Sequence, residues 1–129
     1  KKIFISCSHK DIILANDIAT DIKMAGYDIF LYSMSINVGD NIISEISKNI
    51  STSDILIPII SSSYNNSQFC IDEITAFYAK HLKTKPNSIL PIRIDNTEIP
   101  AIFSAYKYFN YENDNYNSCI MELVNKKLR

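Results

Sequence analysis

Short runs of apolar residues, each ended by polar residues, recur along this chain. Five such runs lie at residues 2–7, 27–32, 55–60, 88–94 and 106–111. Runs of this length between polar segments are typical of β-strands. The run at 55–60 is the most apolar, as expected of a central strand that is covered on both faces. Pro58 lies within it and removes one ladder hydrogen bond, which is unusual for such a strand.

The segments between these runs carry apolar residues at helical spacing, which predicts helices between the strands. Gly26 is the expected stop after the first helix, and Asp40 and Ser67 are the expected N-caps of the next two. A last helix is expected at 117–128. Polar residues predict loops at 33–41 and 61–67, and a loop or irregular helix at 95–104. The helix residues expected to be buried are Ala15, Ile18, Ala19, Ile22, Ala25, Ile43, Ile46, Ile50, Cys70, Ile74, Phe77 and Tyr78.

Strands that alternate with helices indicate an α/β fold with one parallel sheet and right-handed crossovers. The length of 129 residues predicts a single domain, 1–129. Because the chain begins at Lys1 and runs directly into a strand, we expect it to be part of a longer protein. No apolar run approaches the ~18 residues that a membrane-spanning helix needs.

Charge and cysteine content narrow the function classes. The formal net charge is -1, and basic residues do not cluster except near the C-terminus, so nucleic acid is not an expected direct ligand. Cys7, Cys70 and Cys119 are odd in number and lack metal-type spacing. They indicate reduced thiols, a cytoplasmic location and no metal site.

The candidate chemistry lies in the helix that follows the most apolar strand. Phe69 and Glu73 are four residues apart and therefore share one helical face. The carboxyl edge of an open parallel sheet is where such folds bind ligands, which makes Glu73 the first candidate for catalysis. The alternatives are that Glu73 is a solvated helix carboxylate and that Phe69 is a core aromatic.

Three sequence blocks occur together and resemble one family. Residues 4–11 read FISCSHKD, residues 37–40 read NVGD, and residues 69–73 read FCIDE. In this order they resemble the opening strand, the BB loop and the W-C-x-x-E helix of TIR (Toll/interleukin-1 receptor) domains, most closely the bacterial group. Cys7, Val38 and Phe69 stand where tyrosine, proline and tryptophan are common in the family.

The resemblance implies a flavodoxin-like five-stranded parallel sheet with helices on both faces. It also implies two possible functions. One is an NAD+ glycohydrolase or cyclase in bacterial antiviral defence or cell death, activated when TIR domains associate into oligomers or filaments under a fused or associated sensor domain. The other is a non-catalytic adaptor module for signalling assembly.

The chemistry of NAD+ cleavage suits a single carboxylate. Nicotinamide leaves as a neutral molecule, so no general acid is required, and one carboxylate can stabilise the cationic ribose. In this interpretation Glu73 is catalytic, NAD+ is the substrate and no cofactor is needed. Capture by water would give ADP-ribose, and capture within the molecule would give a cyclic ADP-ribose species. The residues expected to bind substrate are Ser8, His9, Lys10, Tyr32, Gly39, Asp40 and Phe69.

Simpler interpretations exist for several of these residues. His9 and Lys10 are also compatible with solvated loop positions, and Tyr32 with packing beneath the BB loop. A phosphoacceptor receiver or a flavin-binding domain would share the fold. However, serines occupy the places where a receiver needs acidic residues, and the two glycines, Gly26 and Gly39, make no phosphate-binding loop.

Overall fold

The computed structural model describes residues 2–32, 38–81, 89–103, 106 and 108–111. Its centre is a sheet of five parallel strands in the order β2-β1-β3-β4-β5. This is the strand order of flavodoxin-like folds. The predicted α/β class and five-stranded parallel sheet are therefore confirmed. The strands are β1 (Lys2–Ser6), β2 (Asp28–Phe30), β3 (Ile55–Ile60), β4 (Ile92–Arg93) and β5 (Phe109–Asn110).

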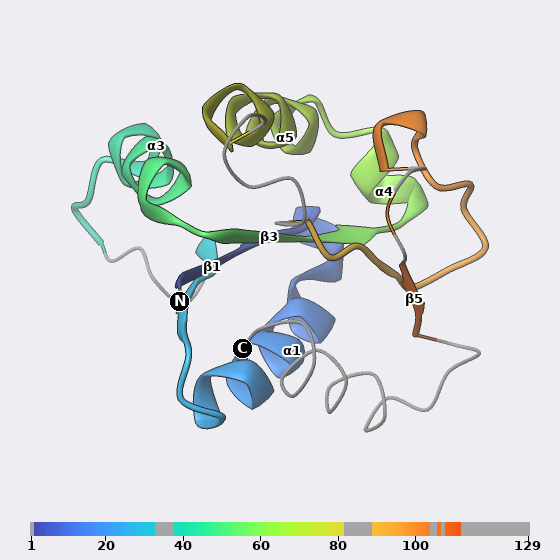
Figure 1. Cartoon of the computed structure of the whole chain (residues 1–129), viewed down its shortest axis with the longest axis horizontal. Helices are drawn as coiled ribbons and strands as arrows, with labels where there is room; N and C mark the ends of the chain where they lie inside the picture. Colours follow the sequence, from blue (N-terminus) through green and yellow to red (C-terminus); the bar gives the residue numbers. More distant parts are fainter. Residues whose placement is uncertain (1, 33–37, 82–88, 104–105, 107, 112–129) are drawn as a thin grey trace.

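Helices cover both faces of the sheet (Figure 1). On one face lies α1 (Ile12–Met24), which follows the short 3-10 helix η1 (His9–Asp11). On the other face lie α3 (Ile42–Thr52), α4 (Ser62–Asn65) and α5 (Gln68–His81). A second 3-10 helix, η2 (Ala101–Phe103), precedes β5. The helix predicted at 117–128 lies outside the described residues.

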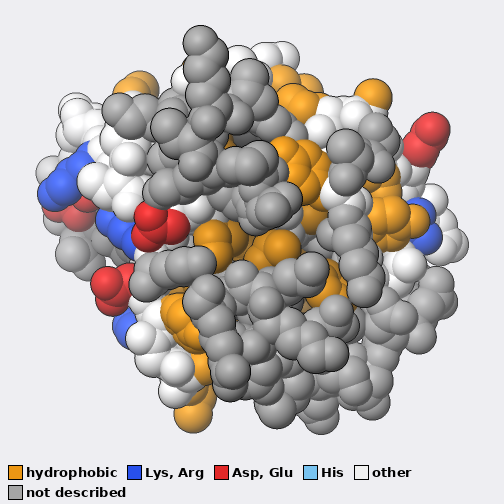
Figure 2. All heavy atoms as spheres, viewed as in Figure 1, with side chains coloured by type: hydrophobic (Ala, Val, Ile, Leu, Met, Phe, Trp, Pro, Cys, Tyr) orange, Lys and Arg blue, Asp and Glu red, His pale blue; other side chains and the backbone are white. Residues whose placement is uncertain are grey.

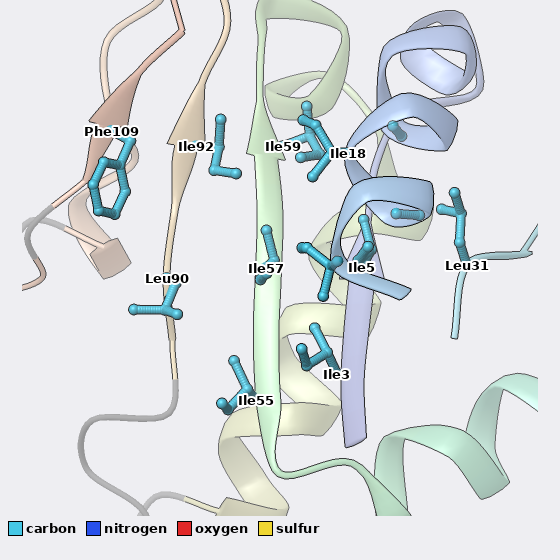
Figure 3. Packing of buried hydrophobic residues seen from close by; sticks show 13 residues of the cluster. Ile3, Ile5, Ile18, Leu31, Ile55, Ile57, Ile59, Leu90, Ile92 and Phe109 are labelled. Atoms are coloured by element: carbon cyan, nitrogen blue, oxygen red, sulfur yellow. The ribbon is translucent and has the colours of Figure 1, made fainter. Parts of the chain in front are cut away.

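The central strand β3 separates two hydrophobic clusters. All six of its residues are buried, and successive side chains point to opposite faces. Ile57 and Ile59 pack with Ile18 of α1 in one cluster (Figure 3). Leu56 packs with Phe77 of α5 in the other. Pro58 does not interrupt β3, which pairs with β1 on one side and β4 on the other.

The ends of the helices agree with the predicted caps at two of three places. Gly26 follows α1 with a φ of +99°, a conformation that favours glycine. The Ser67 hydroxyl accepts a hydrogen bond from the Cys70 N–H at 3.3 Å and caps α5. The prediction for Asp40 is wrong, since the Asn41 side chain caps α3 by accepting from the Ser44 N–H at 3.0 Å. Both residue types are good caps, and the helix begins one residue later than the sequence pattern indicates.

Two residues that were expected in the core are exposed. Ala25 lies beyond the last residue of α1, and Ile43 in the first turn of α3 is 77% exposed. The buried face of α3 instead includes Asn49, whose side-chain N–H donates to the Glu45 carbonyl at 2.7 Å. Because this amide group is paired inside the helix, it can be buried at low cost. Cys70 and Phe77 are buried as predicted, whereas the side chains of Ile74 and Tyr78 lie outside the described part.

The segment 61–67 was predicted as a loop but contains the short helix α4. The Ser61 hydroxyl caps this helix by accepting from the Tyr64 N–H at 3.0 Å. Tyr64 is 1% exposed and packs in the same cluster as Phe77. Four residues are too few for a helical period to be visible in a sequence. The core contact of one aromatic side chain therefore fixes this helix.

The outer strands are shorter than predicted. At the fourth strand, the Leu90 N–H donates to Leu56, but Pro91 has no N–H, and regular pairing resumes only at Ile92–Arg93. The second and fifth strands span three and two residues in place of the expected runs at 27–32 and 106–111. The 95–104 segment contains η2, in agreement with an irregular helix.

Two further observations concern the surface. No helix in the described ranges has both the length and the apolar composition to cross a bilayer. On the face shown in Figure 2, acidic and basic side chains lie at both the left and the right of the view, and hydrophobic side chains are visible between these two sides.

Candidate active site

A pocket of about 310 Å³ lies at the carboxyl edge of the sheet. The ends of β1 and β2, the start of α3 and the helix α5 contribute its walls. Ligands of open α/β folds bind at this edge, where the order of strands reverses. The lining is largely apolar with a few polar groups, as in many small-molecule sites. The described lining residues are Ile5, Cys7, His9, Ile12, Leu31, Tyr32, Ile42, Ser67 and Glu73.

Glu73 is the carboxylate in the wall of this pocket. Its side chain is only 6% exposed. Burial raises the pKa of Glu73 to about 7, and a hydrogen bond from Ser6 acts in the opposite direction. A buried carboxyl group with a pKa near neutrality is typical of functional sites. Glu73 is therefore not the solvated helix carboxylate that was considered as an alternative.

Two buried hydroxyl groups support this carboxylate. The Ser6 hydroxyl, at the end of β1, donates to Glu73 Oε1 at 2.8 Å. The Ser6 oxygen in turn lies 3.0 Å from the hydroxyl oxygen of Tyr64 in α4. Both side chains are 1% exposed. Ser6 of β1 thus links the carboxylate of α5 to Tyr64 of α4, although β1 is far from both helices in the sequence.

Two cysteines near Glu73 carry neutral thiols. Burial is the main cause that raises the pKa of Cys7 to about 12 and that of Cys70 to about 11. Charge repulsion from Glu73 acts in the same direction for both. Because the thiolate is the reactive form, neither residue is suited to be a nucleophile at neutral pH. Cys7 contributes a small apolar surface to the pocket.

The loops beside the pocket are tied together by one short hydrogen bond. The Ser61 hydroxyl, which follows β3, donates to Asp11 Oδ2 at 2.6 Å. Asp11 ends the 3-10 helix that follows β1. Hydrogen bonds to charged groups are the stronger ones in proteins. This contact holds the segments after β1 and β3 in a fixed relation at the carboxyl edge.

The predicted binding residues after the first strand occupy different places. Ser8 is buried, and its hydroxyl accepts from the Lys10 N–H at 3.3 Å as the cap of η1. His9 is exposed and lines the pocket. Lys10 is exposed and is not among the described residues of the lining. Of these three residues, His9 is therefore the one that lines the described part of the pocket.

Of the remaining residues that were predicted to bind substrate, some line the pocket and others do not. Tyr32 lines the pocket and is 38% exposed. Gly39 has a φ of +95°, which favours glycine, and both Gly39 and Asp40 are exposed and absent from the described lining. Phe69 lies one turn before Glu73 in α5, but its side chain lies outside what the structure describes. Its predicted role stays a prediction.

The contact of Ser6 with the carboxylate and that of Tyr64 with Ser6 were not predicted from the sequence. Ser6 does carry a signal, because it is a polar residue directly after the apolar residues of β1. Tyr64 is an aromatic residue in a segment of serines and asparagines, which suggests packing but names no partner. Only the fold brings Ser6 to Glu73, which is 67 residues away in the chain, and to Tyr64, which is 58 residues away.

The polar groups of the pocket include one carboxylate that can stabilise a positive charge. Across the described parts of the chain, no group of three or more His, Cys, Asp or Glu side chains is placed to hold a metal ion. The pocket presents one carboxylate, one imidazole, one phenol and one serine hydroxyl among apolar side chains. In a largely apolar site a carboxylate stabilises a developing cation more strongly than it would in water.

Sequence and structure comparisons place this geometry among known proteins. Residues 3–124 match the family model described as TIR domain. A curated relative in Aquimarina amphilecti, named 3' cyclic ADP-D-ribose synthase AaTIR, is 30% identical over 114 residues. The match covers 84% of this chain and 34% of that protein, so the chain spans about a third of the length of the relative.

Solved structures share the fold. The TIR domain of the Toll-related receptor TRR-2 from Hydra magnipapillata superposes with a TM-score of 0.75 at 16% identity, covering 93% of this chain and 91% of that one. The TIR domains of the activated Roq1 resistosome superpose with a TM-score of 0.66 at 21% identity, covering 74% and 58%. At these identities the likeness concerns the fold alone.

Proposed function

The chain belongs to the TIR domain family, and we propose that it is an enzyme that cleaves the bond between nicotinamide and ribose in NAD+. The observation that supports this most is the buried Glu73 carboxylate in the wall of a largely apolar pocket. The name of the Aquimarina amphilecti relative as a cyclic ADP-ribose synthase points in the same direction, because such a product forms when NAD+ loses nicotinamide.

In the proposed reaction the nicotinamide and its ribose occupy the pocket. Its volume is at the lower end of the range for small-molecule sites, so we expect the rest of the dinucleotide to lie outside it. The exposed side chains of His9 and Lys10 are then available to the diphosphate. The ionised Glu73 faces the ribose and stabilises the positive charge that develops as neutral nicotinamide leaves.

The test is nicotinamide release from NAD+ by the purified chain, measured by chromatography, with the protein both free and clustered on beads. We expect release by the unchanged protein and a loss of roughly 10²-fold or more in Glu73→Gln. Asp72→Asn is the matched control, because Asp72 is the neighbouring carboxylate on the same helix and is exposed. Activity in Glu73→Gln equal to that of Asp72→Asn would remove Glu73 from the mechanism.

The same assay separates the enzyme from a non-catalytic interaction module. An adaptor would release no nicotinamide in either state of clustering. Analysis of the ribosyl product by mass spectrometry then distinguishes ADP-ribose from a cyclic product, because the product of capture by water is heavier by the mass of one water molecule.

We also propose that the chain self-associates, and that clustering by a sensor domain in a bacterial defence protein activates it. The support is a set of exposed apolar side chains at 38–43, close in sequence and named here the 38–43 surface: Val38 is fully exposed, and Ile42 and Ile43 are 42% and 77% exposed. Exposed apolar residues that gather at one place mark interaction sites more often than isolated ones do. This surface includes the start of α3, whose Ile42 reaches the pocket wall, so association there would affect the site.

The association is tested by multi-angle light scattering over a range of protein concentrations. We expect Val38→Asp to lower the apparent mass at high concentration and to lower the activity of the clustered protein. Ile13→Asp is the control, because Ile13 is 79% exposed on α1, which covers the other face of the sheet. Equal effects of the two substitutions would show that the 38–43 surface has no special role.

A further inference from the structure

We propose that Ser6 and Tyr64 are positioning residues that hold the Glu73 carboxylate in its reactive orientation through two consecutive hydrogen bonds. This inference deepens the proposed function and rests on it for its consequence in catalysis. The geometry on which it depends is present without substrate. It can therefore be tested independently of any activity.

The direction of the two hydrogen bonds follows from the number of protons. The Ser6 hydroxyl has one hydrogen, which it donates to Glu73 Oε1 at 2.8 Å. The 3.0 Å contact between the Ser6 and Tyr64 oxygens must then use the Tyr64 hydrogen. Tyr64 thus donates to Ser6, and Ser6 donates to the ionised carboxylate. Consecutive bonds in one direction polarise and strengthen each other.

The arrangement is rigid because each of its three groups is buried in a different element. Ser6 ends β1, Tyr64 lies in α4 and Glu73 in α5, and none is more than 6% exposed. Tyr64 is further fixed by the cap of α4, in which its N–H donates to Ser61. One carboxylate oxygen is thereby held from the side of the sheet. The orientation of Glu73 at the pocket wall is consequently set before any substrate arrives.

The hydrogen bonds also favour the ionised form of the carboxylate. Burial alone opposes ionisation of Glu73, and the hydrogen bond from Ser6 acts against that effect. Removal of the Ser6 hydroxyl should therefore raise the pKa of Glu73 further. Removal of the Tyr64 hydroxyl should do the same to a smaller extent, since it acts through Ser6. A merely structural role would change stability and leave this pKa where it is.

The experiment measures the Glu73 pKa directly by carbon NMR titration of protein labelled at glutamate side chains, with Glu73→Gln to assign the signal. We expect Ser6→Ala to raise this pKa by about one unit and Tyr64→Phe by less. We expect the rise of kcat with pH to shift by the same amounts, and kcat at neutral pH to fall roughly 10-fold in Ser6→Ala. Tyr64→Phe is the conservative change, because only one oxygen is lost.

Ser53→Ala is the matched control. Ser53 is also fully buried, and its hydroxyl donates to the Asn49 carbonyl at 2.5 Å, at the end of α3. We expect Ser53→Ala to lower stability without moving the Glu73 titration. An unchanged pKa in both Ser6→Ala and Tyr64→Phe would overturn the proposal. Shifted titrations in a protein that releases no nicotinamide would instead support the positioning and reject the proposed function.

Discussion

At the scale of single residues, the central fact is that a carboxyl group is buried where a solvated one would be more stable. A carboxylate inside a protein is costly unless it is paired or hydrogen-bonded. From the described residues, Glu73 receives a hydrogen bond from Ser6, and its pKa remains raised to about 7 because burial outweighs that bond. The ionised form of Glu73 is therefore less stable in the folded chain than it would be in water. This is the form that a developing cation in the pocket would stabilise most.

This cost predicts how stability depends on pH. The pKa of Glu73 is about 7 in the folded chain and near 4.5 when the residue is unfolded, so folding is favoured by proton uptake between these values. The stabilising effect is fully present below about pH 4.5 and is lost as pH rises to 7. Above pH 7, we expect Glu73→Gln to be more stable than the unchanged chain by on the order of 3 kcal/mol.

The measurement is urea unfolding of both proteins at several pH values between 5 and 8.5. The difference in free energy of unfolding should shrink as pH falls toward 5. Asp72→Asn, which removes an exposed charge from the same helix, should show a small difference that hardly changes over this range. A constant difference for Glu73→Gln would mean that the carboxyl group is not desolvated in the folded chain.

At the scale of elements, Ser61 holds the segment after β3 through two hydrogen bonds of its hydroxyl group. The Ser61 hydroxyl donates to Asp11 Oδ2 at 2.6 Å and accepts from the Tyr64 N–H at 3.0 Å. It therefore caps α4 and links that helix to the segment after β1. We expect Ser61→Ala to lower the free energy of unfolding by about 2 kcal/mol, since both a helix cap and a hydrogen bond to a charged group are lost.

The control for this prediction is the next residue in the chain. The Ser62 side chain is exposed, and its contact with Asp95 uses the backbone N–H, which alanine retains. Ser62→Ala should stay within about 0.5 kcal/mol of the unchanged chain. If chemical denaturation gives the same value for both serines, neither the contact with Asp11 nor the cap of α4 contributes measurably to stability.

The elements also show how far a sequence pattern reaches. Residues 55–60 were predicted as a strand with correct ends, because an apolar run of six residues between Asp54 and Ser61 has the length of a strand and is short for a helix. The cap at Asn41 was missed because Asp40 is an equally good candidate. The cap is chosen by which side chain reaches the third helical N–H, and that is a property of three-dimensional structure.

The candidate site also contains one part that the sequence predicted and one part that it did not. Glu73 was found from its spacing to Phe69 and from the family resemblance, both of which depend on neighbouring residues in the sequence. The contact between Ser6 and Glu73 joins residues that are 67 positions apart, and the contact between Ser6 and Tyr64 joins residues that are 58 positions apart. A periodic pattern carries no information on pairs so far apart. Such contacts follow only from the three-dimensional arrangement of the strands and helices.

At the scale of the whole molecule, the sheet separates two cores that contribute to the site in different ways. One cluster lies against α1 and includes Ile5, which also lines the pocket. The other lies beneath α3, α4 and α5 and contains Tyr64. The pocket is thus built where both layers end at the carboxyl edge of the sheet. Its geometry depends on both layers being tightly packed.

Adjacent residues of β3 allow each layer to be tested. Leu56 points into the cluster with Tyr64, and Ile57 points into the cluster at α1, and neither side chain is exposed. Leu56→Ala and Ile57→Ala should each lower the free energy of unfolding by about 2–5 kcal/mol, because each leaves a cavity in a packed interior. Such a loss is large beside the total of about 5–15 kcal/mol of most domains.

Chemical denaturation followed by circular dichroism measures both effects, and Met24→Ala is the control. Met24 is 82% exposed at the end of α1, so its truncation should change the free energy of unfolding by less than about 0.5 kcal/mol. If Ile57→Ala were as mild as Met24→Ala, the layer at α1 would not be a packed core. Ile5 would then line the pocket without being fixed by a packed cluster, and the shape of the pocket would depend only on the layer that contains Tyr64.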